Sequence, residues 1–171
     1  MLTLRNADNL DSVLISGDYR DINTLHQSLY TIVGRDGEYA KYRGVRKLVL
    51  RFCSDLQDAI QVNQQIELVE NGIDVDSMNT DGFFTPDKNV YFKCTINYPE
   101  VLFVFMALND FVRCYAKKKA KSTRFPLSDQ ENILNSTITN VRLFQGEVVK
   151  CLQQKVTKAC FKRIMNLMHD H

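Results

Sequence analysis

Residues 90–119 read VYFKCTINYPEVLFVFMALNDFVRCYAKKK, and this stretch decides most of the expected fold. Its first seven residues are rich in β-branched and aromatic side chains, which predicts a strand over 90–96. Pro99 then opens a helix, because proline at the first helical position loses no hydrogen bond. Residues 101–108 are apolar on every side of that helix, so we expect other elements to surround its N-terminal end. A polar face begins at Asn109, while Val112 and Tyr115 continue the buried face. We expect the helix to leave the core at its C-terminus.

The chain before this stretch predicts three short strands and two helices. Apolar residues near the N-terminus form two strands, of which the second ends at the turn signal Ser16-Gly17. Asp18 or Asp21 can cap the first helix by accepting a backbone N–H, and Gly34 is suited to end it. The second helix follows a polar loop, and a strand at 66–69 comes after it. The two apolar helix faces consist of Ile22, Leu25, Leu29, Ile32 and Val33, and of Val45, Leu48, Val49, Phe52, Leu56, Ala59 and Ile60.

The chain after this stretch predicts two more helices. Ser128 and Glu131 match a capping box, in which the two side chains satisfy two backbone N–H groups. The helix that they introduce has an apolar face, and a last helix starts at about Thr157. The expected buried residues are Leu134, Ile138, Val141, Val148 and Leu152 in the first of these helices, and Val156, Cys160, Ile164, Leu167 and Met168 around the second.

This order of elements predicts an α+β fold, because strands and helices do not alternate regularly. We expect a small, mainly antiparallel sheet of about four strands packed against about five helices, in a single domain over residues 1–171. The composition, 44% apolar and 25% charged, is typical of a globular domain. The longest apolar run is Val101–Leu108, too short to span a bilayer, and no basic-then-apolar leader opens the chain. We therefore expect a cytoplasmic protein with no membrane partner.

The five cysteines, at positions 53, 94, 114, 151 and 160, predict free structural thiols. Their number is odd, no pair has the C-x-x-C spacing, and each lies among apolar neighbours. A buried free cysteine behaves as a small apolar residue. The sequence therefore favours a reducing compartment without a disulfide framework.

The formal net charge of +2 conceals an asymmetry along the chain. Residues 1–112 contain 10 Lys and Arg against 16 Asp and Glu, whereas residues 113–171 contain 12 against 4. Opposite charges in the two parts can neutralise each other within one fold, which we favour, or they can pair head-to-tail with another copy of the chain.

Two basic clusters are candidate binding sites. The first occupies the start of a helix, where the helix dipole makes cations unfavourable and exposed N–H groups suit an anion. Asp36 and Glu38 can instead satisfy it internally, which we favour. The second cluster lies at a helix C-terminus, where cations are stabilised without any ligand. The anion-binding candidates are Lys41, Arg43, Arg46 and Lys47, and the basic patch consists of Lys117, Lys118, Lys119 and Lys121.

No recognised catalytic motif is present, so catalytic residues are unknown and we predict no cofactor. An enzyme would require some of a scattered set of residues to converge in one pocket. No metal site is predicted: residues 74–82 depart from the calcium-loop pattern, and His169 and His171 end the chain. The candidate residues, some of which would have to converge, are His26, Tyr42, Arg46, Asp110 and Cys114.

Several stretches resemble a family of small bacterial proteins, mostly from low-GC Gram-positive species, that has no assigned function. The resemblance covers nearly the whole chain and implies a bacterial, cytosolic, single-domain protein. It implies no catalytic or binding residue. The stretches are MLTLRN at 1–6, ISGDY at 15–19, VENG at 69–72, KNVY at 88–91, PEVLFV at 99–104 and MALNDF at 106–111.

We therefore expect a non-catalytic interaction or regulatory module that self-associates, most simply as a homodimer, with a further protein partner possible. An enzyme of unrecognised class is the first alternative. A weak, non-specific nucleic-acid binder that uses the basic C-terminal part is the second, although the pI of about 8.2 is below that of dedicated binding domains.

Overall fold

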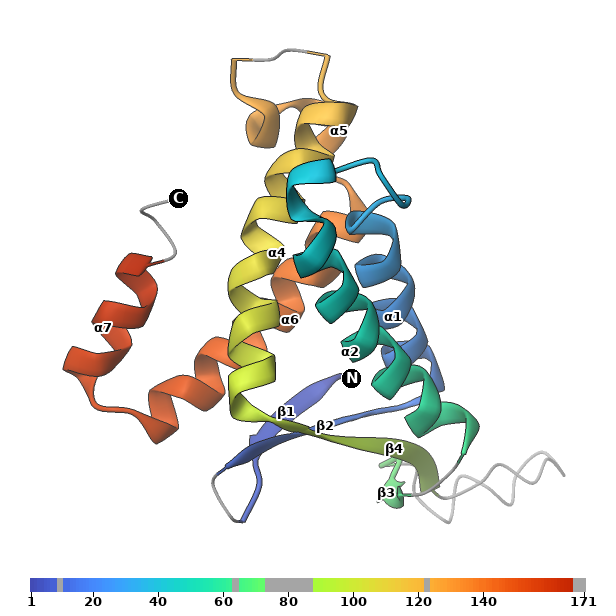
Figure 1. Ribbon diagram of the computed structural model, residues 1–171. Coiled ribbons are helices and arrows are strands. Elements are labelled where there is room, and N and C mark those ends of the chain that lie inside the picture. Colours follow the sequence, from blue (N-terminus) through green and yellow to red (C-terminus); the bar gives the residue numbers. More distant parts are fainter. Residues whose placement is uncertain (9–10, 63–64, 73–87, 122–123, 168–171) are drawn as a thin grey trace, which may run out of the picture.

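The computed structural model describes residues 1–8, 11–62, 65–72, 88–121 and 124–167. Within them lie four strands, six α-helices and two short 3-10 helices (Figure 1). The strands are β1 (Thr3–Asn6), β2 (Ser12–Gly17), β3 (Ile66–Glu70) and β4 (Lys88–Asn97). The helices are α1 (Tyr19–Ile32), η1 (Ala40–Tyr42), α2 (Arg43–Gln61), α4 (Tyr98–Lys119), η2 (Pro126–Ser128), α5 (Gln130–Ile133), α6 (Ser136–Lys155) and α7 (Lys158–Leu167).

The strands form one antiparallel sheet in the order β1-β2-β4-β3. Helices α1, α2, α4 and α6 stand together on one face of this sheet (Figure 1). The predicted α+β class, with a four-stranded antiparallel sheet, is therefore confirmed. The number of helices is one higher than expected, because one predicted helix is divided into α5 and α6.

The core lies between the sheet and these four helices. Val13 and Ile15 of β2 and Ile96 of β4 are buried beneath them, and the rings of Phe52 on α2 and Phe144 on α6 lie 5.5 Å apart. Helix α4 lines this core along most of its length, and the prediction that Val112 and Tyr115 continue its buried face is confirmed. Its buried residues are Tyr98, Val101, Val104, Phe105, Ala107, Leu108, Phe111, Val112, Tyr115 and Ala116.

The expectation that residues 101–108 are enclosed on every side is wrong for one face of α4. Phe103 is exposed, and Leu102 and Met106 are only partly buried. An apolar residue on the outer side of a helix stays exposed unless another element covers it. Here no described helix covers this face, and Leu167 of α7 lines a hollow with Phe103 and Met106.

Local signals at the start and end of α1 are confirmed. The Asp18 side chain accepts a hydrogen bond from Asp21 N at 2.8 Å, and the Asp21 side chain accepts one from Asp18 N at 3.2 Å. Both candidate caps thus act together, because each satisfies one N–H group at the open end of the helix. Gly34 follows the helix with φ of +69°, a conformation that disfavours any residue with a Cβ.

The capping box expected at Ser128 is wrong. Asp129 is the N-cap instead, and its side chain accepts a hydrogen bond from Glu131 N at 3.1 Å. Helix α5 then ends at Ile133, and a second cap, Asn135, starts α6 by accepting from Ile138 N. Leu134 lies in the break between the two helices and is 83% exposed rather than buried.

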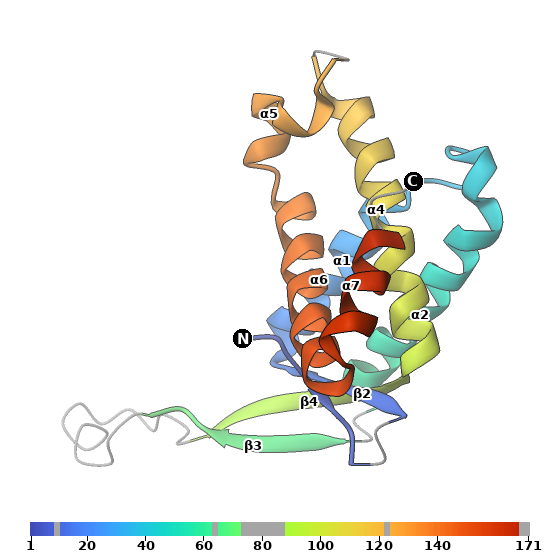
Figure 2. The same ribbon diagram turned by 90° about the vertical axis from the view of Figure 1, so that its left-hand side faces the viewer.

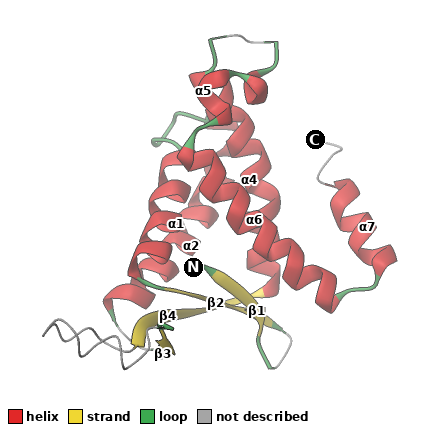
Figure 3. Ribbon diagram, turned by 180° about the vertical axis from the view of Figure 1, so that it is seen from behind, coloured by secondary structure: helices red, strands yellow, loops and turns green. Residues whose placement is uncertain are grey.

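The expected burial of the last helix is also wrong. Helix α7 extends away from the bundle (Figure 3), and none of its residues is buried. Phe161 and Met165 are partly buried against the core, whereas Cys160 and Leu167 are exposed. An apolar face predicts that a helix packs on something, but it does not show how much of the body lies within reach. Met168 lies outside the described residues.

We predict that Phe52→Ala lowers the free energy of unfolding by about 3–5 kcal/mol, because it leaves a cavity between α2 and α6. The matched variant Leu134→Ala should change it by less than about 0.5 kcal/mol, since that side chain faces solvent. Urea denaturation of both variants measures this. A large decrease in the free energy of unfolding of Leu134→Ala would contradict the break between α5 and α6.

Candidate functional site

The two basic clusters lie at the same end of the molecule, which the sequence could not indicate. The loop after α1 packs against the C-terminal half of α4, where the rings of Tyr39 and Tyr42 lie 6.1 Å and 5.8 Å from the ring of Phe111. Glu38 on this loop forms an ion pair with Lys118 on α4 at 2.7 Å. The loop therefore places the start of α2 beside the end of α4.

The predicted anion site at the start of α2 is partly satisfied by the chain itself. Arg46 is half-buried, and its Nε donates to the backbone oxygen of Gly34 at 3.0 Å while Nη1 lies 3.7 Å from Asp36 Oδ1. Lys41 lies over the ring of Tyr42 at 5.6 Å. Arg43 and Lys47 are exposed and form no ion pair with any described residue. An incoming anion would thus meet Arg43 and Lys47 at an open surface, not in a pocket.

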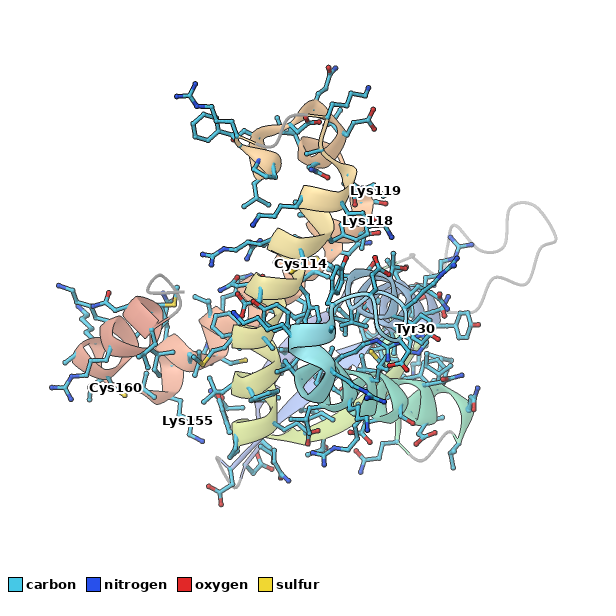
Figure 4. The ribbon with its side chains drawn as sticks, turned by 45° about the horizontal axis from the view of Figure 1, so that its top comes forward. Tyr30, Cys114, Lys118, Lys119, Lys155 and Cys160 are labelled. Atoms are coloured by element: carbon cyan, nitrogen blue, oxygen red, sulfur yellow. The ribbon has the colours of Figure 1, made fainter. Side chains whose placement is uncertain are left out.

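The predicted basic patch at the end of α4 is divided among several contacts. Lys118 and Lys119 lie on the last turn of α4, beyond Cys114 (Figure 4). Lys118 is paired with Glu38, Lys119 lies 5.8 Å from the ring of Tyr115, and Lys121 is paired with Glu131 at 2.9 Å. Exposed pairs of this kind stabilise the fold only slightly, so most of the positive charge remains available to a partner.

Of the five candidate residues, some of which an enzyme would need in one pocket, two lie in the same hollow and three do not. Tyr42 and Asp110 line one hollow of about 220 Å³ with Asn109 and Arg113, but no hydrogen bond joins Tyr42 to Asp110. Of the remaining three, neither Arg46 nor Cys114 lines this hollow, and His26 lies on α1 with its ring 6.3 Å from that of Tyr30. The described part of the chain therefore brings two of the five residues to one hollow and leaves the others outside it.

One polar network beside this hollow was not expected from the sequence. Arg142 Nη1 donates to Asn109 Oδ1 at 2.5 Å and to Gln145 Oε1 at 2.8 Å. Gln145 is buried, and its Nε2 donates to the backbone oxygen of Phe105 at 2.8 Å. Burial and the nearby Arg113 lower the pKa of Arg142. The network joins α4 to α6. No local motif predicts it, because its members come from two segments that are far apart in the sequence.

Two groups of exposed apolar side chains were also missed. One lies on the outer half of the sheet and the other on the turn that contains α5. The sequence placed the first group in two predicted strands, and of the second group it placed only Leu134, on the apolar face of a helix. Only the arrangement of the helices shows that nothing described covers them. Their members are Ile66, Leu68 and Val90 on the sheet, and Phe125, Leu127, Ile133 and Leu134 on the turn.

The cysteines are all free, but they are not all buried. Burial raises the pKa of both Cys53 and Cys94 to about 12. Burial also raises the pKa of Cys114, and Asp110 adds to the rise while Lys117 and Lys41 oppose it. Cys160 is exposed on α7, at a distance from Cys114 (Figure 4). The expectation of buried structural thiols is therefore wrong for Cys160.

Metal and membrane sites can be judged only for the part of the chain that the structure describes. There, no cluster of three or more His, Cys, Asp or Glu side chains could hold a metal ion. No helix in the same residues combines the length and apolar character needed to cross a bilayer. The loop over 74–82 and the histidines at 169 and 171 lie outside the described residues.

We predict that a thiol reagent labels Cys160 first. Cys160 is exposed to the reagent, whereas Cys53 and Cys94 are buried and burial raises the pKa of both thiols, which keeps them neutral at about pH 8. Mass spectrometry after timed labelling should show one modification per chain before unfolding and five after it. Early labelling of Cys53 or Cys94 would contradict the packing of the core.

The Glu38–Lys118 pair should give a pH-dependent contribution to stability. The hydrogen bond from Lys118, with one from Arg35 N, lowers the pKa of Glu38. A carboxylate with a lowered folded pKa stabilises the fold above its unfolded pKa of about 4.3, and this contribution is lost as the pH falls through the folded pKa. Glu38→Gln should thus be less stable than the natural protein at about pH 7, by less than about 1 kcal/mol.

Urea denaturation at about pH 7 and about pH 3 measures the effect, since protonation of Glu38 removes the charge that the variant lacks. The gap between the two proteins should narrow at the lower pH. An equal gap at both pH values would show that the Glu38 charge contributes nothing.

Comparison with known proteins gives one match. The model of the family described as "Domain of unknown function (DUF6904)" matches residues 2–171. No curated protein and no solved structure matches the chain. Because the match extends over nearly the whole sequence, the chain belongs to the DUF6904 family of domains of unknown function.

Proposed function

We propose that this protein is a non-catalytic interaction module that forms a homodimer through one edge of its sheet. The contact consists of the ribbon, which we define as β3 (Ile66–Glu70) with the β4 residues that pair with it, 88–92. The observation that carries the proposal is an apolar surface on the ribbon that no described helix covers. The resemblance described above supports a single bacterial domain that acts in the cytoplasm.

The apolar surface of the ribbon is a continuation of the core face of the sheet. Alternation along β4 places Val90 on the same face as the buried Cys94 and Ile96, and Leu68 is the partner of Val90 in the register. The ribbon extends beyond the helices (Figure 2). Ile66, Leu68 and Val90 are consequently 53%, 59% and 44% exposed. Contiguous apolar exposure of this kind is typical of an interaction surface.

The β3 edge of the sheet is open among the described residues, whereas the β1 edge is protected. Strand β1 has only four residues and packs against α6, where Asn6 Nδ2 donates to the backbone oxygen of Cys151 at 3.3 Å. Strand β3 contains neither lysine nor proline, the residues that commonly prevent edge pairing. Glu67 of β3 forms an ion pair with Lys93 of β4 at 2.9 Å. This pair offsets the charge of one of the two carboxylates of β3.

A second copy fits this edge by antiparallel pairing around a two-fold axis. If the axis passes through Leu68, that residue faces its own copy, and Ile66 lies opposite Glu70 of the partner. The four-stranded sheet then continues as eight strands, and the backbone groups of both β3 edges are satisfied. The Leu68 side chains from the two copies bury each other on the face that the helices leave open.

This contact differs from head-to-tail pairing of the acidic and basic parts of the chain. Main-chain hydrogen bonds and apolar burial are only weakly screened by salt, whereas attraction between exposed charges is strongly screened. Salt dependence therefore separates the two modes. The enzyme alternative has less support, because only Tyr42 and Asp110 of the five candidate residues line one hollow among the described residues, and no hydrogen bond joins them.

We expect size exclusion with light scattering at micromolar concentration to give about twice the chain mass of 19.8 kDa. The mass should be the same at about 0.05 M and about 1 M salt. Leu68→Lys should give 19.8 kDa, because a lysine at the centre of the edge opposes pairing. Leu143→Lys, at an exposed leucine on α6, is the matched control and should remain dimeric.

Three results would contradict the proposal. The natural protein could be monomeric at every concentration, Leu68→Lys could keep the dimer mass, or both lysine variants could dissociate equally. A dimer that is lost at high salt would support the head-to-tail mode instead.

A further inference from the structure

We propose that the turn at the far end of the molecule from the sheet is a peripheral docking site for an anionic lipid surface. We call this turn the tip and define it as residues 124–134, which include η2 and α5. The tip lies beyond the C-terminal end of α4, opposite the sheet and the ribbon (Figure 1). It is therefore separate from the dimer contact proposed above.

The tip presents four large apolar side chains to solvent within ten residues. Phe125, Leu127, Ile133 and Leu134 are 66%, 44%, 60% and 83% exposed. Single exposed apolar residues are normal on a protein surface, but a group of four on one projecting turn is not. Aliphatic and aromatic side chains of this kind enter the boundary between lipid headgroups and acyl chains.

One polar residue of the tip, Asn132, points inward and attaches the tip to the end of α4. Asn132 is buried, and its Nδ2 donates to the backbone oxygens of Ala116 at 2.9 Å and Pro126 at 2.8 Å. These two bonds attach α5 to the end of α4 and to η2. Ile133 and Leu134 follow Asn132 directly, and both are exposed. A buried amide thus holds the backbone of this part of the tip against α4 and η2.

The tip and the adjoining end of α4 carry a surplus of positive charge. Arg124 lies 5.7 Å from the ring of Phe125, and Lys119 is exposed on the last turn of α4. The two carboxylates of the tip are engaged locally: Asp129 accepts from Lys121 N at 3.1 Å, and Glu131 is paired with Lys121 Nζ. Basic residues around an apolar group are attracted to anionic headgroups.

Lipid fits these features better than nucleic acid or a membrane span. Bases stack on aromatic rings, whereas three of the four exposed apolar residues of the tip are aliphatic and offer no ring for stacking. A peripheral contact needs no spanning helix. The expectation of no membrane partner rested on the absence of a long apolar run, and that reasoning does not extend to a surface contact.

Sedimentation with phospholipid vesicles tests the proposal on the full chain. The natural protein should bind vesicles of phosphatidylcholine mixed with phosphatidylglycerol and bind pure phosphatidylcholine at least about tenfold more weakly. The double variant Ile133→Gln/Leu134→Gln should lose at least about tenfold in binding to the mixed vesicles. The double variant Lys119→Gln/Arg124→Gln should reduce the preference for the anionic vesicles.

Two control variants keep the result specific to the tip. Leu143→Gln removes an exposed leucine from α6, and Leu68→Lys removes the proposed dimer contact. Both variants should bind the mixed vesicles as tightly as the natural protein when binding is expressed per mass of protein. Failure of the dimer proposal would therefore not affect this test. Circular dichroism should show the same helical signal for every variant, since each altered side chain is exposed.

The proposal is overturned if the natural protein does not bind the mixed vesicles, or if the Ile133→Gln/Leu134→Gln variant binds them equally well. Equal binding to pure phosphatidylcholine would overturn the role of charge. Loss of binding in Leu143→Gln to the same extent as in the tip variant would show that the tip is not the contact.

Discussion

The pairing of β2 with β4 is the interaction on which the rest of the structure depends. It joins residues 12–17 to residues 92–97, two segments that are about half the chain apart. Each strand runs almost directly into a helix, β2 into α1 and β4 into α4. Because the strands are antiparallel, the two helices rise from opposite ends of the same ladder and meet over its apolar face. Helices α2 and α6 then complete the layer above the sheet (Figure 1).

The same register leaves part of the sheet uncovered. Strand β4 has ten residues, but only its last six pair with β2 beneath the helices, and its first five pair with β3. The core face therefore continues along β4 past the end of the helical layer, where Val90 and Leu68 remain exposed. One length mismatch between two strands thus creates both the buried core and the apolar ribbon. At the opposite end, the buried Asn132 attaches the tip, which carries the second apolar surface, to α4 and η2.

The fold class and most helix and strand positions could be predicted from the sequence, whereas which distant residues lie together could not. Pro99 and Asp18 act within one helical turn, so neighbouring residues were enough to assign them. Leu134 was misassigned because periodicity alone cannot show that Asp129 and Asn135 each start a separate helix. The candidate site was only partly predictable: both basic clusters were found, but Glu38 and Lys118 are eighty residues apart, and only the folded chain places the clusters together. The exposure of the ribbon depends on how far the helices extend over the sheet, and local sequence patterns do not predict this.

Hydrogen exchange of the β3 backbone at two protein concentrations tests the central claim most directly. If the ribbon edge pairs with a second copy, the amides of residues 66–70 should exchange more slowly at high concentration than at low concentration. The amides of β1, at the edge covered by α6, should exchange at the same rate in both samples. Equal exchange of the β3 amides at both concentrations, in samples whose masses differ, would show that the chains associate elsewhere and would contradict the account.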